Sequence, residues 1–445
     1  MYVAAPPDTD AILRTLPGER FFEILPATAQ QDGSEYLHWD KLRHLEPPEG
    51  LSHAEWWLGI KMSRNALRRS MPLTDSEGRA FAYSSVPDSI FRQLHRVDQE
   101  CSGSIAMAEV VTADEHARQH YLVNSLMEEA IRSSQLEGAV TTRRVAKELL
   151  RSGRPPKDRS EHMILNNYRG LQYIREAIGD QLTPGAVLEL QRILTDGTLD
   201  NPDAAGRLQR PDEDRVAVYD RRDGSLLHQP PPADQLPARL AAMCNFANGT
   251  DNPDLFIHPV IRAILLHFWL AYDHPFEDGN GRTARALFYW SMRTQGYWLV
   301  EYLSISTILR KAPAQYARSF LLTETDDRDT TYFIEYQLEV IRRAVEALHA
   351  YLRRKVREIR DVERLIKGSR DFNHRQLALL SNAIRNPDQT YTFQSHATSH
   401  GVTHETARTD LQGLVARGFL EQRRLGRRYV FTPSPDLPEQ AKRVA

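Results

Sequence analysis

The stretch HPFEDGNGR, residues 274–282, decides how the chain is interpreted, because it separates two apolar helical segments. Before it, apolar side chains recur at helical spacing from Ile261 to Tyr272, and the pattern stops at His274-Pro275. After it, residues 282–295 are predicted to form a second helix that ends at Gly296. The stretch is therefore predicted to be a short loop between two buried helices.

The glycines of this loop predict an anion-binding backbone. Gly279 and Gly281 flank Asn280 and let the main chain turn successive N–H groups inward. The loop opens directly into a helix, whose N-terminus attracts phosphate through its partial positive charge and unpaired N–H groups. The sequence thus predicts a phosphate-binding loop.

Four side chains near this loop supply the other parts of a phosphoryl or nucleotidyl transfer. His274 titrates near neutrality and is the candidate base for an attacking hydroxyl. Asp278 offers a hard oxygen ligand for Mg²⁺ that bridges phosphates. Arg282 lies at the helix N-terminus, and Arg285 follows one turn later on nearly the same face. Each residue alone would be ordinary, but nine ordered positions together indicate a site.

Residues 274–282 match in full the signature of the Fic family, which is His-Pro-Phe, any residue, Asp and Gly-Asn-Gly-Arg, and Arg285 matches the second arginine of its longer form. The chain resembles a Fic (Fido) protein adenylyltransferase over about residues 115–330. Gly206, Arg210 and residues 216–231 look like the hairpin "flap" of that family. The resemblance implies a mainly α fold, with a helical Fic core and a β-hairpin flap.

The implied activity is transfer of AMP from ATP to Ser, Thr or Tyr hydroxyls of target proteins, with release of pyrophosphate. His274 would be the base, Asp278 would hold Mg²⁺, and Arg282 would grip the β- and γ-phosphates. Backbone N–H groups of 279–281, with Asn280, would stabilise charge on the α-phosphate. The flap would hold the target segment by strand addition. The expected nucleotide-site residues are Gly279, Asn280, Gly281, Arg282, Arg285, Leu226, Leu227, His228 and Tyr316, the last of which would line the adenine pocket.

Residues 133–138, SSQLEG, are similar to the inhibitory motif of the family. Glu137 would pair with Arg285 and keep that arginine from the γ-phosphate, while Ser133, one turn earlier, would steady the helix end. A Gly at 138 is typical just past a helix, and Thr141 or Thr142 is expected to cap the next one. The enzyme is then expected to have almost no transferase activity until Glu137 is displaced.

Three parts are predicted along the chain. Residues 1–110 are an N-terminal segment of unknown role. Residues 111–365 would be the Fic domain, with the inhibitory helix at about 115–138, the flap at about 214–231 and the active-site loop at 274–282. Residues 366–445 resemble a winged helix of bacterial regulators, with helices at 374–385, 393–400 and 403–417, the last containing the recognition helix 403–411, and then a hairpin. The wing would carry Arg423, Arg424, Arg427 and Arg428, which suit DNA phosphates, although many such domains contact protein instead.

Composition limits the number of domains, the extent of any basic surface and the expected location of the chain. A chain of 445 residues is expected to form two or three domains, and its net charge of -2 restricts any basic surface to a local patch. Two cysteines indicate neither a disulfide framework nor a zinc site, so a reducing cytoplasm is expected. No apolar run reaches the roughly 20 residues that span a bilayer, so no membrane partner is expected.

Two other hypotheses about the function stay open. The chain could be a DNA-binding regulator that uses its Fic core as a nucleotide sensor, or a Fic enzyme that removes AMP or transfers another nucleotide. Intact His274 and Arg282 favour catalysis over sensing. Intact Gly281-Arg282 argues against the variant that transfers the terminal phosphate. The target protein, self-modification and a homo-oligomeric state are not determined by the sequence.

Overall fold

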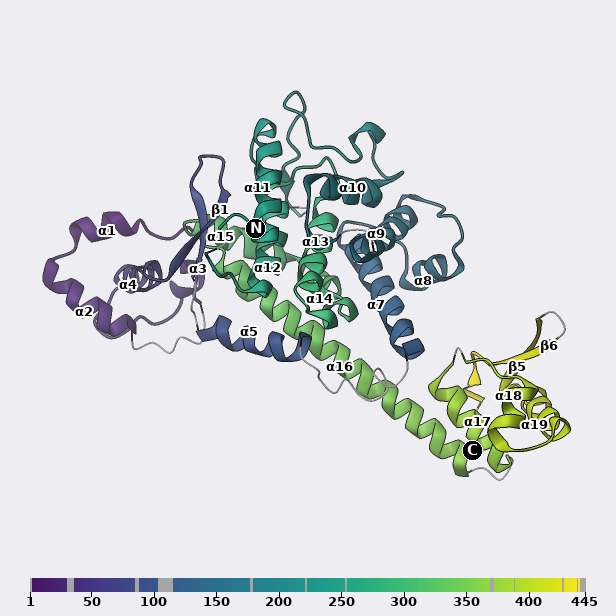
Figure 1. Ribbon diagram of the computed structural model, residues 1–445. Helices are drawn as coiled ribbons and strands as arrows, with labels where there is room; N and C mark the ends of the chain where they lie inside the picture. Colours follow the sequence, from purple (N-terminus) through teal and green to yellow (C-terminus); the bar gives the residue numbers. More distant parts are fainter. Residues whose placement is uncertain are drawn as a thin grey trace. The chain divides into compact units, whose positions relative to one another are not determined.

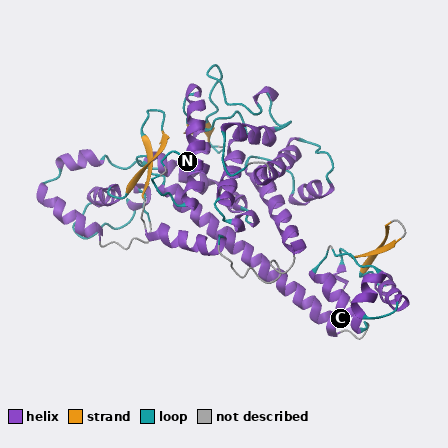
Figure 2. Cartoon of the chain, viewed as in Figure 1, coloured by secondary structure: helices purple, strands orange, loops and turns teal. Residues whose placement is uncertain are grey.

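The chain is mainly helical in the computed structural model, with three two-stranded antiparallel sheets among the described residues (Figures 1 and 2). The structure describes residues 2–29, 36–84, 88–102, 115–176, 179–220, 222–252, 254–368, 372–387, 389–425, 428–437 and 439–440. It has two compact units, Met1–Gly103 with Asn124–Val345, and Ser104–Val123 with Glu346–Ala445. The predicted mainly α class is confirmed, and the domain limits near residues 110 and 365 stay predictions.

The N-terminal region packs into the first unit. Trp56, Trp57 and Leu42 form a small buried cluster, and buried Lys61 lies 2.7 Å from the carboxylate of Asp326. The region contains a hairpin that the sequence analysis did not predict, as well as helices. Its elements are α1 (Thr9–Thr15), α2 (Gly18–Ala29), α3 (Trp39–Leu42), α4 (His53–Asn65), β1 (Arg68–Thr74), β2 (Ala80–Ser84) and α5 (Asp88–Cys101).

Helices α12 and α13 pack against each other at the centre of the first unit (Figure 1). Helix α12 is mostly apolar and is buried along nearly its whole length. Helix α13 begins at Asn280, two residues before the predicted start, and is also buried. The helices of this unit after α5 are the part of α7 (Glu115–Leu136) from Asn124 onward, α8 (Arg143–Ser152), α9 (Arg159–Glu176), α10 (Pro184–Thr195), α11 (Leu236–Asn248), α12 (Pro259–Asp273), α13 (Asn280–Thr294), α14 (Ile305–Lys311), α15 (Pro313–Thr325) and the first part of α16 (Thr331–Gly368).

Local sequence signals explain the ends of several helices. Thr142 caps α8 through its hydroxyl, as predicted, and Gly153 ends α8 in the left-handed conformation. Gly138 follows α7 with a φ of +106°, which fits the predicted helix stop. The predicted hairpin is present as β3 (Val218–Tyr219) and β4 (Leu226–His228), with Val218 opposite His228. Short 3-10 turns cover Pro202–Ala204, Ala233–Gln235 and Trp298–Tyr302.

The second unit contains the predicted three helices and hairpin, in the expected order. These are α17 (His374–Arg385), α18 (Phe393–His400), α19 (His404–Ala416), β5 (Leu420–Leu425) and β6 (Arg428–Pro433). Buried Asp410 on α19 joins the helices, since it accepts hydrogen bonds from Asn373 and Arg375 and contacts His396. Classification as a winged helix stays a prediction. Of the expected wing arginines, Arg423, Arg424 and Arg428 are exposed, and Arg427 lies outside the described residues.

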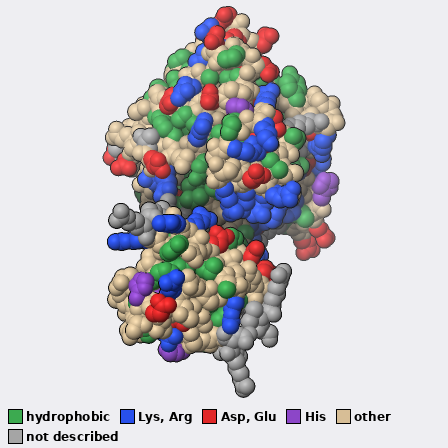
Figure 3. All heavy atoms as spheres, turned by 90° about the vertical axis from the view of Figure 1, so that its right-hand side faces the viewer, with side chains coloured by type: hydrophobic (Ala, Val, Ile, Leu, Met, Phe, Trp, Pro, Cys, Tyr) green, Lys and Arg blue, Asp and Glu red, His purple; other side chains and the backbone are tan. Residues whose placement is uncertain are grey.

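Basic side chains gather over part of one face (Figure 3), although the net charge of the chain is only -2. Figure 3 faces the right-hand side of Figure 1 and shows Lys and Arg side chains gathered over part of that face. Helix α8, on that side of the first unit, exposes Arg143, Arg144 and Arg151. Cys101 and Cys244 are buried, unpaired thiols. None of the helices in the described ranges is long and apolar enough to cross a membrane.

Candidate active site

His274 caps the C-terminus of α12 in a left-handed conformation. Its φ is +44°, which few residues other than glycine adopt, and its N–H donates to the Leu270 carbonyl at 3.0 Å. The loop that follows therefore leaves the buried helix at a fixed angle. This geometry places the imidazole at the junction of helix and loop.

The ring of His274 is in the protonation state that a base requires. Its Nδ1 lies 3.3 Å from the Ala271 carbonyl oxygen, which can only accept, so Nδ1 carries the proton and Nε2 carries the lone pair. Burial lowers the pKa of His274 to about 4, although the nearby negative charge of Glu137 acts to raise it. The imidazole is consequently neutral near pH 7 and can accept a proton at Nε2.

The main chain of the loop is fixed by Asn280. Its side-chain amide accepts from the N–H of Phe276 at 2.9 Å and donates to the Phe276 carbonyl at 2.8 Å. Gly279 has a φ of +87°, and a Cβ there would lie 2.9 Å from Cγ2 of Thr195. The Asn280 amide is thus engaged in shaping the loop, and the backbone N–H groups remain as the expected phosphate donors.

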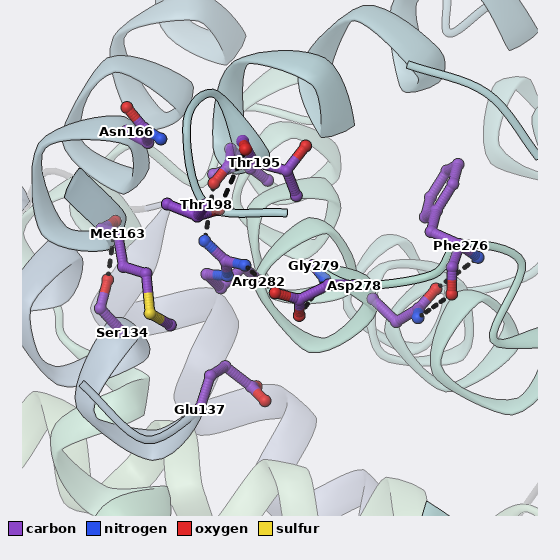
Figure 4. A network of polar contacts seen from close by, with 12 residues as sticks. Ser134, Glu137, Met163, Asn166, Thr195, Thr198, Phe276, Asp278, Gly279 and Arg282 are labelled. Atoms are coloured by element: carbon purple, nitrogen blue, oxygen red, sulfur yellow. Dashed lines mark hydrogen bonds and ion pairs between the residues drawn. The ribbon is translucent and has the colours of Figure 1, made fainter. Parts of the chain in front are cut away.

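Asp278 is the half-buried carboxylate of the loop. Its Oδ1 accepts from the N–H of Gly279 at 2.6 Å, and its Oδ2 lies 3.2 Å from Arg282 and 3.9 Å from Arg159. Figure 4 shows this carboxylate between Arg282 and Gly279. No group of three or more His, Cys, Asp or Glu that could hold a metal occurs in the described part of the chain. A single carboxylate fits Mg²⁺, which commonly takes one or two carboxylates together with substrate phosphates.

Arg282 is fully buried, and its guanidinium is already engaged by protein. It donates to the Leu194 carbonyl at 2.6 Å and contacts Asp278, while its Nε has no hydrogen-bond partner among the described residues. Burial lowers the pKa of the guanidinium. The expected grip on the β- and γ-phosphates stays a prediction, because this structure directs Arg282 to Leu194 and Asp278.

Arg285 forms the predicted ion pair with Glu137, which directly follows α7. The guanidinium NH2 of Arg285 lies 2.7 Å from Oε1 of Glu137, and the same side chain donates to Oγ and the carbonyl of Ser133 at 3.0 and 3.2 Å. Although burial acts in the opposite direction, the charge of Glu137 raises the pKa of Arg285. The structure thus brings together Ser133, Glu137 and Arg285 across 148–152 positions of sequence.

The carboxylate of Glu137 lies at the N-terminus of α13, against Gly281. A Cβ on Gly281 would lie 2.2 Å from Oε1 of Glu137 and 3.0 Å from NH1 of Arg285. The start of α13 carries the unpaired N–H groups and partial positive charge that attract anions. Glu137 therefore occupies the place where the sequence predicts a phosphate.

Tyr316 and the flap residues lie around this centre. The hydroxyl of Tyr316 on α15 lies 2.8 Å from Nε2 of His267, and the charge of Arg285 acts on both groups, so Tyr316 lies beside the Arg285 region. In the flap, Leu226 is exposed and Leu227 is half-buried. His228 instead turns inward, with Nε2 donating to the Tyr272 carbonyl at 2.6 Å and Nδ1 3.1 Å from Glu324. The nucleotide contacts expected of these four residues stay predictions.

Comparison with known proteins agrees with this geometry. The Fic/DOC family model matches residues 181–292. The chain contains a Fic/DOC family domain. A protein named "Protein adenylyltransferase Fic" from Nematostella vectensis is 31% identical over 137 residues, which are 30% of this chain and 29% of that relative. "Protein adenylyltransferase fic-1" from Caenorhabditis briggsae is 41% identical over 59 residues, or 13% and 11% of the two chains.

The fold is also similar to that of a solved Fic family protein from Desulfovibrio desulfuricans G20. The TM-score is 0.51 at 17% sequence identity, with 82% of this chain and 99% of that chain covered. The chain spans less than a third of the length of the first curated relative, whose matched share is 29%. The matched Fic domain contains the loop 274–282 and the flap, whereas Ser133 and Glu137 precede it.

Two residues that support the Fic loop were missed by the sequence analysis. Gln191 on α10 is fully buried, donates to the Asp278 carbonyl at 3.1 Å and accepts from the N–H of Gly206. Arg215, at the base of the flap, donates to the carbonyls of Asp273 and His274 at 2.8 and 3.2 Å. Gln191 could have been found from the sequence, because an amide on the inner face of an amphipathic helix indicates a buried hydrogen-bonding role. Arg215 had no local signal, because its partners lie 58 and 59 residues away.

Proposed function

We propose that this protein transfers AMP from ATP to hydroxyl groups of target proteins, and that Glu137 inhibits this activity. The single observation that carries the proposal is the position of the Glu137 carboxylate, which lies against Gly281 at the N-terminus of α13 and 2.7 Å from Arg285. An acidic side chain on an anion-binding helix start suggests that it takes the place of a phosphate group. The names of the two curated relatives agree with adenylyl transfer.

The chemistry follows from the neutral imidazole. The target Ser, Thr or Tyr hydroxyl attacks the α-phosphorus of ATP while Nε2 of His274 accepts its proton. The bond between the α-phosphorus and the bridging oxygen breaks, and its electrons leave with pyrophosphate. The product is an AMP ester of the target, and the proton stays on His274 until solvent removes it.

The triphosphate would replace Glu137 at the start of α13. NH1 of Arg285 is a buried donor without a hydrogen-bond partner among the described residues, and it faces the space above Gly281. A phosphate oxygen in that space would accept from both the backbone N–H groups and Arg285. Mg²⁺ held by Asp278 would neutralise charge that develops on the phosphates.

Labelling with radioactive ATP tests the proposal. Glu137→Gly protein, cell lysate and Mg²⁺ are incubated with ATP that carries the label in either the α- or the γ-phosphate. We expect protein bands labelled from α-labelled ATP alone, and none with Glu137→Gly, His274→Ala. Label from the γ-phosphate would indicate kinase chemistry, and loss of AMP from a pre-labelled protein would indicate removal of AMP. If the protein binds ATP but transfers no label to any protein, the hypothesis of a nucleotide sensor would be supported.

The partners belong to the same proposal. Target hydroxyls are the first, and a labelled band at the mass of the protein itself would identify self-modification. The second unit is proposed to bind DNA, because Arg423, Arg424 and Arg428 are exposed on one β-hairpin, β5–β6, and clustered arginines suit phosphate contacts. A cytoplasmic location is proposed from the buried, unpaired thiols of Cys101 and Cys244.

A further inference from the structure

The end of α12 is capped by side-chain donors from the flap. Three successive carbonyls, those of Tyr272, Asp273 and His274, accept hydrogen bonds from side chains of the segment 215–228. His228 donates to the first at 2.6 Å, and NH2 of Arg215 donates to the other two at 2.8 and 3.2 Å. The last carbonyls of a helix have no partners within it and carry its partial negative charge, so positive donors stabilise them.

The other nitrogens of Arg215 bind the flap itself. Nε donates to the Pro231 carbonyl at 2.8 Å, just beyond β4, and NH1 donates to the side-chain carbonyl of Gln209, before β3. The N–H of Gln209 in turn donates to the Pro275 carbonyl at 2.9 Å. One guanidinium thus connects both ends of the flap to the residue that caps α12.

We propose that Arg215 is a positioning residue for His274, and that it holds the imidazole and the flap in one fixed arrangement. The proposal rests on the proposed function. A target strand held by the flap must present its hydroxyl to Nε2 of His274 at hydrogen-bond distance. Because His274 has a left-handed backbone with a φ of +44°, its carbonyl and ring keep their direction only while their neighbours hold them.

Arginine suits this place better than lysine. The guanidinium has five N–H donors in a rigid plane, and here they reach four acceptors on three segments of chain. A lysine ammonium at the same position could keep one or two of these bonds. Loss of the guanidinium should move the base relative to the flap without altering the phosphate site at the start of α13.

Arg207 provides a matched control. It lies just before the flap and is partly buried. It donates to the main-chain carbonyls of Asp203 at 2.9 Å and Leu208 at 3.0 Å, and to the carboxylate of Glu213 at 2.6 and 3.0 Å. None of these carbonyls belongs to α12. Arg207→Ala therefore removes the same charge and a comparable set of bonds, with no effect expected on the helix end.

The test compares Arg215→Ala, Arg215→Lys and Arg207→Ala in full-length Glu137→Gly protein. Two quantities are measured, steady-state labelling from α-labelled ATP and hydrogen exchange of peptides covering 215–231 and 268–282. For Arg215→Ala we expect kcat to fall about ten- to one-hundred-fold, as small misplacements of reacting groups do, with the KM for ATP unchanged. Exchange should rise in both peptides together. Arg215→Lys should recover part of kcat, and Arg207→Ala should change neither peptide.

The outcomes separate the two proposals. If Glu137→Gly itself labels no protein, the proposed function fails, and hydrogen exchange alone decides the role of Arg215. If Arg215→Ala leaves exchange of 268–282 unchanged, Arg215 does not hold the helix end and the inference is wrong. An equal loss in kcat and in ATP affinity, or the same loss from Arg207→Ala, would assign Arg215 a general structural role and would also overturn it.

Discussion

Replacing Glu137 by glycine is the most direct test of how this protein is regulated. The change removes the carboxylate that lies 2.7 Å from NH2 of Arg285 and against Gly281, and it touches no group assigned to the chemistry. Glu137 follows the last residue of α7, Leu136, and precedes Gly138, so a glycine there costs little helix stability. Arg285 keeps its two bonds to Ser133.

The size of the effect can be worked from the ion pair. A hydrogen bond between charged groups contributes about 1.5–3 kcal/mol. If ATP must displace Glu137 before it binds productively, that energy corresponds to roughly ten- to one-hundred-fold in ATP affinity and in labelling rate at low ATP. Glu137→Gln keeps a neutral hydrogen bond and should give an intermediate increase. Arg285→Ala should not mimic Glu137→Gly, because it also removes the proposed phosphate partner.

The assay measures initial labelling rates from α-labelled ATP for wild type, Glu137→Gln and Glu137→Gly, alongside ATP affinity by calorimetry. We expect both quantities to rise in that order. If Glu137→Gly binds ATP no more tightly than wild type and labels no faster, the carboxylate does not compete with the triphosphate. Residues 133–138 would then be an ordinary helix end.

Four further outcomes are expected. His274→Ala should abolish labelling and leave ATP affinity within about two-fold, since the ring acts on the hydroxyl; equal labelling by mutant and parent would exclude it as the base. Arg282→Ala should lower ATP affinity about ten-fold or more and AMP affinity much less, as measured by calorimetry, if the side chain turns to the phosphates. Because burial lowers the pKa of His274 to about 4, the imidazole is uncharged even at pH values well below 7. The Glu137→Gly labelling rate should therefore stay level between about pH 6 and 8, whereas a change in rate near pH 6.5 would place the ring in solvent. If residues 370–435 bind DNA, affinity should fall steeply with salt and Arg427→Ala, Arg428→Ala should flatten that dependence, whereas absence of a gel shift at low salt would favour a protein contact.

The sequence by itself determined the features that depend on neighbouring residues. The apolar stripe before His274, the glycines at 279 and 281 and the turn around Gly224 predicted the loop, the anion-binding helix start and the hairpin. These features are local, since a short run of residues sets the backbone angles and the helix end. The pairing of Glu137 with Arg285 was predicted only because the family signature supplied the second partner.

Tertiary structure alone decided where the side chains of that loop point. Asn280 binds the main chain of Phe276, and Arg282 turns inward to Leu194, which lies 88 residues earlier. The capping of α12 by Arg215, and the position of Glu137 over Gly281, likewise join residues that are far apart in the chain. No local pattern encodes such contacts, because each buried donor takes whichever acceptor the packing of α7, α10, α12 and α13 brings within reach.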